Sequence, residues 1–280
     1  MIRSRFLLCT CLAVLAVGCE DDKKKDTPTP APSVAPSAAA APSAMPSASA
    51  SSGPAASAAP KEAPPAAGAK RYAVLMGKGT FLIDAPLEKI KGMTDEVRGH
   101  LDVNPTDLGK STGEIMVRLS TLKTSTFDSA DKNVAQTEHA RNWMEVGNES
   151  PAASRMKYEW ATFTVSSVDA TPHALGEAKE EGGVRVVKAT VGGTLNLHGI
   201  PSKKTVPMTL RFKGPADAPT EVELQTDGAM PVSMKEHDVK PRDTLGGLLN
   251  GALDRIGKKI DDKVQVSFQA TSKLTMPAEP

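Results

Sequence analysis

Apolar and polar residues alternate in segment after segment of this chain, and no other feature restricts its fold so strongly. In the segment "VPMTLRF" every second residue is apolar. A period of two places these side chains on one face of an extended strand and the polar residues between them on the other. The pattern therefore predicts half-buried antiparallel strands, bounded by Gly, Pro, Asp and Asn.

About eight such segments follow one another along residues 72–270. The residues predicted to share the buried apolar face are, segment by segment, Tyr72, Val74 and Met76; Val97, Leu101 and Val103; Ile115, Val117 and Leu119; Ala161, Phe163 and Val165; Leu195 and Leu197; Val206, Met208, Leu210 and Phe212; Val222 and Leu224, then Met230, Val232 and Met234; and Val264, Val266, Phe268 and Ala270. In the valine-rich start of the fifth segment we expect a register shift near Val186–Val187. A sheet of this many strands removes its exposed edges by closing. We predict an all-β fold, a closed antiparallel eight-stranded barrel whose apolar faces line a packed core or a ligand cavity.

Two segments depart from the alternation and predict one or two short helices. Residues 129–146 are polar at helical density and predict a loop containing a short helix, with Trp143 and Met144 near its end. Residues 244–260 carry apolar side chains at the spacing of one helical stripe. We expect this second helix to dock on the barrel as a fixed cover of one end, with a moving lid as the alternative. The lid candidates are Leu245, Leu248, Leu249, Leu253 and Ile256.

The first nineteen residues predict export. Arg3 and Arg5 precede an apolar run that is too short to span a membrane as a stable helix. The following "LAVGC" resembles the lipobox of bacterial lipoproteins, so residues 1–19 are interpreted as a lipoprotein signal peptide and Cys19 as the lipidated residue. The alternative is an ordinary secreted protein cut nearby. We therefore expect a lipid anchor in the bacterial cell envelope, with the protein facing the periplasm.

Residues 20–70 are rich in Ala, Pro and Ser and predict a disordered linker. They contain no aromatic residue and almost no branched apolar side chain, so they cannot bury enough surface to offset the entropy of ordering. The remaining residues 71–280 are long enough for one folded domain. All three cysteines precede this domain, which therefore has no thiol for a disulfide, a metal or a nucleophile.

Charge and motifs disfavour nucleic-acid binding and catalysis. Without Arg3 and Arg5 the 34 basic residues fall to 32 against 33 acidic ones, so no basic footprint for nucleic acid remains. The chain has no serine elbow or nucleotide-binding loop, and no metal-binding spacing among its histidines, at 100, 139, 173, 198 and 237. We expect no catalytic residue, no metal and no cofactor. The most suggestive acid–base cluster, Glu138, His139 and Arg141, is interpreted as a solvated face or a structural contact at the barrel rim.

His198 interrupts the alternation in "LNLHGIP". Asn196 and His198 are expected to share the polar side of a strand, before Gly199, Ile200 and Pro201 turn the chain into the next strand. In that setting we interpret His198 as a residue that forms hydrogen bonds at a hairpin rather than as a base or a ligand.

The order and spacing of several segments are distinctive: "APLEKIKGMTDEVRGHLDV", "GEIMVRLSTLKTSTFDSADKNVAQTEHARNWMEV", "YEWATFTVSSV", "GGTLNLHGIPSKKTVPMTLRF", and "MPVSMKEHDVKP" followed by "IDDKVQVSFQA". Together, over about residues 72–273, they resemble the YceI-like family. The Leu-His-Gly hairpin is the most specific of them. The resemblance implies a lipocalin-like barrel over residues 71–280, whose elongated apolar cavity holds a long isoprenoid or fatty amphiphile. The chain departs from the family pattern where Trp143-Met144 stands in place of the usual aromatic pair.

Two functions are open at this point. The first is a membrane-tethered protein that holds an isoprenoid or another long-chain amphiphile, for carriage, storage or sensing. The second is a structural or protein-interaction module of the envelope, with a filled barrel and no ligand. For the first function the residues predicted to line the cavity are Val117, Leu119, Phe163, Val165, Leu195, Leu197, Leu210, Phe212, Val266 and Phe268. The oligomeric state is left open.

Overall fold

The computed structural model describes residues 64–84, 89–240 and 262–275. Its strands are β1 (Lys70–Asp84), β2 (Lys89–Thr94), β3 (Val97–Val103), β4 (Thr112–Arg118), β5 (Lys123–Thr124), β6 (Trp160–Thr171), β7 (Glu180–Glu181), β8 (Val184–Leu197), β9 (Ile200–Lys213), β10 (Glu221–Thr226), β11 (Met230–Ser233) and β12 (Lys263–Leu274). Its helices are α1 (Ala130–Trp143), α2 (Ala152–Tyr158) and four short 3₁₀ helices, η1 (Leu108–Lys110), η2 (Leu119–Thr121), η3 (Leu175–Glu177) and η4 (Lys235–His237).

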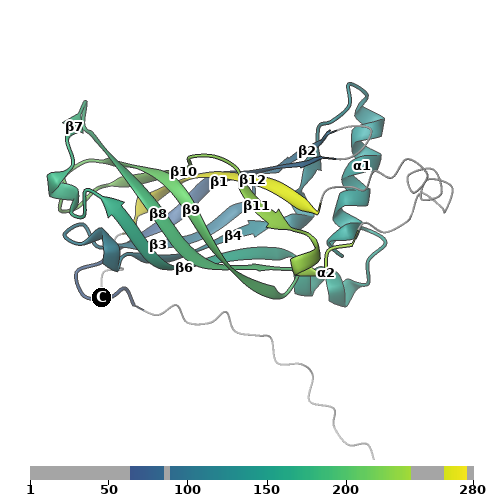
Figure 1. Ribbon diagram of the computed structural model, residues 1–280, viewed down its shortest axis with the longest axis horizontal. Coiled ribbons are helices and arrows are strands. Elements are labelled where there is room, and N and C mark those ends of the chain that lie inside the picture. Colours follow the sequence, from purple (N-terminus) through teal and green to yellow (C-terminus); the bar gives the residue numbers. More distant parts are fainter. Residues whose placement is uncertain (1–63, 85–88, 241–261, 276–280) are drawn as a thin grey trace, which may run out of the picture. The chain divides into compact units, whose positions relative to one another are not determined.

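Eight strands close into one antiparallel barrel, as predicted (Figure 1). Around the barrel their order is β1-β3-β4-β6-β8-β9-β10-β12, and β12 returns to pair with β1. This closing pair runs from Tyr72 opposite Leu274 to Ile83 opposite Val264. Each strand of the ring therefore has a partner on both sides, which removes the exposed edges of an open sheet.

At two of the eight positions in the barrel wall, two consecutive strands together take the place of one long strand. β3 pairs with the beginning of β1, from Lys70 to Ala73, and β2 pairs with the second half of β1. In the same way β10 and β11 both pair with β12. The short strands β5 and β7 extend the sheet beside β2 and β8. Asp95–Glu96 separate β2 from β3, and residues 227–229 separate β10 from β11. In both places the two strands together span the length of their neighbour in the wall.

Strand β1 contains a bulge that makes one prediction wrong. Met76, which the alternation places inside, is 64% exposed, and Leu75 beside it is 55% exposed. The pairing of β1 with β12 shifts between Val74 and Met76, so one extra residue is inserted and the later side chains change faces. Beyond the bulge Phe81 and Ile83 point inward and line the interior.

The register shift predicted near Val186–Val187 does not occur. Val186 is 47% exposed and Val187 is fully buried, as simple alternation requires. β8 pairs with β9 without interruption from Val184 to Leu197. Two adjacent valines suggested a shift, but one of them faces solvent.

Buried side chains close one end of the barrel, which we call the core end. Tyr72, Leu108, Leu175 and Phe212 are at most 1% exposed and belong to one cluster. The loops that carry Leu108 and Leu175 are joined by backbone hydrogen bonds, such as the one from Leu175 N–H to the carbonyl of Pro105 at 2.8 Å. Contacts between these loops therefore hold the core end shut.

Tyr72 adds a polar contact to this apolar cluster. Its hydroxyl donates a hydrogen bond of 2.8 Å to the carbonyl of Pro219, in the loop between β9 and β10. Burial of the ring raises the pKa of Tyr72 to about 12. The phenol therefore keeps its proton, and with it the hydrogen bond, well into the alkaline range.

The opposite end, the helical end, carries α1 and α2, which lie in the connection between β5 and β6 (Figure 1). Ser129 caps α1 by accepting a hydrogen bond from Lys132 N–H. Arg141, near the end of α1, donates a hydrogen bond of 3.0 Å from Nε to the carbonyl of Leu122, which lies between η2 and β5. This bond fixes the end of α1 to the segment that precedes the helix. The predicted helix within 129–146 is present and is longer than expected, whereas α2 is not predicted.

In the part of the chain that the structure describes, none of the helices has the length and apolar character needed to cross a membrane. The predicted signal peptide with Cys19, most of the predicted linker and the helix predicted at 244–260 lie outside the described residues.

Candidate functional site

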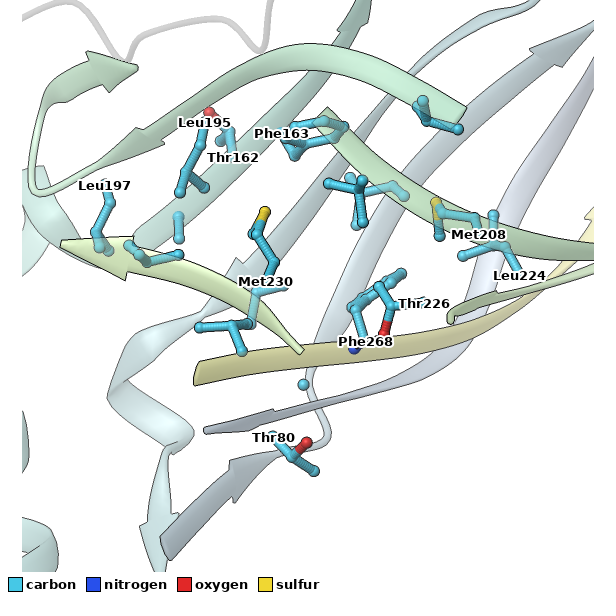
Figure 2. Close-up of a pocket in the computed structure, with 18 of the residues that line it drawn as sticks. Thr80, Thr162, Phe163, Leu195, Leu197, Met208, Leu224, Thr226, Met230 and Phe268 are labelled. Carbon is cyan, nitrogen blue, oxygen red and sulfur yellow. Dashed lines mark hydrogen bonds between the residues drawn. The ribbon is translucent and has the colours of Figure 1, made fainter. Parts of the chain in front are cut away.

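An apolar cavity of about 250 Å³ extends through the interior of the barrel. Leu108 and Phe212 line it at the core end, and Trp143 and Met144 line it at the helical end. Figure 2 shows Phe163, Met230 and Phe268 reaching toward this space from β6, β11 and β12. The volume is many times what a single water needs, and the lining is what an apolar chain requires.

Among the described residues no charged side chain lines this cavity. Besides the indole N–H of Trp143, the polar side-chain groups of the lining are hydroxyls of Thr and Ser, and some of these hydroxyls form hydrogen bonds within the protein. Thr226 Oγ1 accepts from Phe268 N–H at 3.1 Å, and Thr94 Oγ1 donates to the carbonyl of Arg118 at 3.1 Å. The cavity therefore suits an uncharged, largely hydrocarbon occupant.

All ten residues predicted to line a cavity do lie on its wall. These are Val117, Leu119, Phe163, Val165, Leu195, Leu197, Leu210, Phe212, Val266 and Phe268. Each belongs to, or directly follows, a strand of the ring, and the closed sheet brings together stripes that are far apart in the sequence. Contact between these side chains and a ligand stays a prediction.

The lining also includes residues that strand alternation does not identify as cavity residues. Ala140, Trp143 and Met144 reach the cavity from the end of α1. Their spacing of three and four residues was a usable signal, because it places them on one face of a helix. Val239, which follows η4, also lines the helical end of the cavity, beside Met234, which alternation does place on the buried face.

Asp262, which precedes β12, holds η4 at the rim of the cavity. The carboxylate of Asp262 accepts hydrogen bonds from Ser233 Oγ at 2.5 Å and from Lys235 N–H at 2.6 Å. These hydrogen bonds, that of Ser233 above all, lower the pKa of Asp262. Its backbone carbonyl accepts from Met234 N–H at 2.8 Å, which places the Met234 side chain against the cavity.

His198 lies in the turn between β8 and β9, and not on a strand as predicted. Leu197 pairs with Ile200, so the turn consists of His198 and Gly199 alone. Their φ angles are 53° and 75°, the left-handed values of a two-residue turn that suits the twist of a hairpin. Ile200 and Pro201 therefore already belong to β9, and the prediction of a turn formed by Gly199, Ile200 and Pro201 is wrong.

The imidazole of His198 nevertheless forms the expected hydrogen bond at the hairpin. Its Nδ1 lies 3.2 Å from the carbonyl of His237, and because a carbonyl only accepts, Nδ1–H is the donor. Its ring packs against the ring of Tyr158 in α2, tilted by 34° with 4.0 Å between centroids, and its Nε2 lies 4.0 Å from Oε1 of Glu145. His198 thus joins α2, η4 and the segment that follows α1, which is a structural role at the helical end.

Backbone strain is concentrated at this same junction. In the described chain, the non-glycine residues with positive φ are Glu145 at 57°, His198 at 53° and Asp238 at 52°. Left-handed backbone costs free energy in residues with a side chain, so the contacts made there must offset it. The junction fixes the relative placement of the loops that carry Met144 and Val239 to the cavity.

Of the cluster Glu138, His139 and Arg141, the carboxylate of Glu138 and the guanidinium of Arg141 lie 4.0 Å apart. Glu138 Oε1 accepts from the backbone N–H of Asn148, and Arg141 Nε is engaged with the carbonyl of Leu122. Glu138 therefore secures the connection that follows α1, whereas Arg141 ties the helix to the segment that precedes it, as expected of structural contacts at the rim. Within the described ranges, no three His, Cys, Asp or Glu residues come together as a set that could hold a metal ion.

Comparisons with known proteins identify the family. A profile of the YceI-like domain matches residues 79–272, that is 194 of the 280 residues. No curated protein matches the chain. Similar solved structures include a polyisoprenoid binding domain from Saccharophagus degradans implicated in plant cell wall breakdown, with 14% identity and a TM-score of 0.46 over 73% of this chain and 98% of that one. Burkholderia cenocepacia BcnA is also 14% identical, with a TM-score of 0.44 over 70% of this chain and 95% of its own. Because the profile spans more than half of its length, the chain belongs to the YceI-like family.

Proposed function

We propose that this protein binds an isoprenoid or another long-chain amphiphile in the barrel cavity, for carriage, storage or sensing in the cell envelope. The observation that carries the proposal is the cavity itself, which is lined by apolar side chains from the core end to the helical end. Burial of hydrocarbon contributes about 0.8 kcal/mol per CH₂. Ten buried methylenes therefore supply roughly 8 kcal/mol before the cost of immobilising the ligand is subtracted.

The test is uptake of a fluorescent isoprenoid by the purified full-length chain, together with native mass spectrometry of the protein as it is recovered from cells. We expect saturable uptake of one ligand per chain, and a co-purified species of the mass of a long-chain amphiphile. Protein that is repeatedly recovered empty and takes up no probe would contradict the proposal. It would favour instead a structural or protein-interaction module of the envelope.

We further propose that Cys19 carries a lipid that tethers the barrel to a membrane through the linker of residues 20–70, with the barrel facing the periplasm. The support is the basic start of the chain, its short apolar run and the "LAVGC" that ends in this cysteine. One acyl chain binds a membrane only weakly, so stable anchoring needs more than one chain.

Cys19→Ser is expected to abolish incorporation of a radiolabelled fatty acid and to release the protein from the membrane fraction. Cys11→Ser is the matched control, because it removes a thiol from the same segment without changing the proposed acceptor. The control is expected to keep its label. Wild-type protein that stays unlabelled, or a Cys19→Ser variant that keeps the label, would rule out this anchor.

A further inference from the structure

Trp143, at the helical end of the cavity, carries a hydrogen-bond donor that no described residue of the protein engages. Trp143, the last residue of α1, lines the cavity beside Ala140 and Met144. Its indole Nε1 is buried and has no hydrogen-bond partner among the described residues. An indole nitrogen can only donate, and a buried Trp usually finds an acceptor, because an unpaired buried donor loses its hydration without compensation.

Trp160, the other tryptophan of the chain, has a different environment. The guanidinium groups of Arg98 and Arg118 lie 5.3 Å and 5.8 Å from its ring, and the residue does not line the cavity. Only Trp143 therefore combines a place on the cavity wall with a buried donor that lacks an acceptor.

The surroundings of Trp143 favour an uncharged acceptor. No charged side chain among the described residues lines the cavity, so a carboxylate or phosphate would be buried there without a counter-ion. Trp143 also stands at the C-terminal end of a fourteen-residue helix, where the helix dipole is negative and disfavours an anion. The lining hydroxyls of Thr94 and Thr226 are already engaged within the protein.

We propose that Trp143 Nε1–H donates a hydrogen bond to a neutral oxygen at the polar end of the bound amphiphile, such as an alcohol, carbonyl or ester oxygen. The polar end of the ligand then lies at the helical end, and its chain extends toward Leu108 and Phe212 at the core end. This inference rests on the proposed function and specifies the head group that the same cavity selects. It makes Trp143 a specificity-determining residue.

The experiment compares three probes with the same chain: geranylgeraniol, geranylgeranyl phosphate and the corresponding hydrocarbon without an oxygen. The full-length chain, labelled with ¹⁵N in its tryptophans, gives two indole N–H resonances, one for each tryptophan. The Trp143→Phe variant assigns them. We expect the Trp143 resonance to move downfield with the alcohol and clearly less with the hydrocarbon, while that of Trp160 stays in place.

Affinities supply the second readout. Trp143→Phe keeps an aromatic ring and removes the donor, so it should weaken binding of the alcohol about threefold to tenfold and leave binding of the hydrocarbon unchanged. Trp160→Phe is the matched control and should change neither. The phosphate should bind the wild type more weakly than the alcohol does.

Each contrary outcome is distinct. If all three probes bind, but Trp143→Phe affects them equally or the alcohol leaves the Trp143 N–H where the hydrocarbon does, the hydrogen bond is refuted and the lipid-binding function stands. If the phosphate binds most tightly, the preference for a neutral head is refuted. If no probe enters the protein, the proposed function itself fails, and this inference fails with it.

Discussion

The Gly79→Phe variant is expected to lower the affinity of the protein for a long-chain amphiphile about fiftyfold while its barrel stays folded. Gly79 lies on β1 and lines the cavity. A Cβ added there would meet only Thr94 Cγ2 at 3.5 Å and Val117 Cγ1 at 3.7 Å, which are ordinary contacts with two other lining residues. A phenyl ring at this position extends into the cavity and displaces the ligand. Loss of three buried methylenes costs roughly 2.4 kcal/mol, which is the fiftyfold change.

The matched control is Lys78→Phe, which places the same ring one position earlier on β1, where alternation directs it to the outer face. Its ligand affinity should equal that of the wild type. Titration with the fluorescent isoprenoid measures both variants, and the circular dichroism of the sheet checks their folding. If Gly79→Phe folds and binds the probe as tightly as the wild type does, the cavity is not the binding site.

Gly99→Ala is expected to cost about 4 kcal/mol or more in the free energy of unfolding, and it can prevent folding altogether. Gly99 lies in β3 opposite Ile115, with φ at +131°, a backbone conformation that residues with a side chain rarely adopt. A Cβ there would lie 2.0 Å from the backbone carbonyl oxygen of Glu114 in β4. Because both groups belong to the ladder between neighbouring strands, relief of this clash requires separating part of the barrel wall.

Gly182→Ala separates the two contributions to that cost. Gly182 also has positive φ, at +60°, but a Cβ there meets nothing within 4 Å. This variant should lose only about 1 to 2 kcal/mol, the cost of left-handed backbone alone. Urea denaturation of the purified proteins measures both changes. Equal destabilisation of the two variants would show that the contact with Glu114 does not restrict the barrel.

The strands could be predicted because half of each one had to be buried. Val206, Met208 and Phe212 on β9, and Val264 with Ala270 on β12, follow strict alternation and face inward in the structure. Every such stripe needs a partner stripe, and about eight of them imply a closed sheet.

The exceptions depend on backbone geometry that the residue types do not reveal. The extra residue at Leu75 does not disturb the alternation of apolar residues in the sequence, so the pattern predicts the wrong face for Met76. The pattern places the turn too late because Pro201 suggests the end of a strand, although β9 accommodates this proline opposite Asn196. Single-sequence patterns carry no information on which residue of a turn adopts a left-handed conformation.

The candidate site could be predicted where the sheet builds it and not where loops do. All ten predicted residues line the cavity because the apolar faces of the strands in a closed sheet all face the same interior. Trp143 and Val239 reach the same cavity from connections whose path depends on contacts such as those of His198 and Asp262. Those contacts join segments that are distant in the sequence, and no local pattern encodes them.

The pairing of β1 with β12 also determines when the barrel can form during synthesis. Tyr72 and its partner Leu274 are 202 positions apart, so the first strand of the ring waits for the last. Until β12 has left the ribosome, β1 and β10 each keep one edge without its native neighbour. Contacts of such long range slow folding, and open edges invite pairing with other chains. A nascent chain that ends before Lys263 therefore cannot complete the wall, and the growing polypeptide needs protection from aggregation until its final strand emerges.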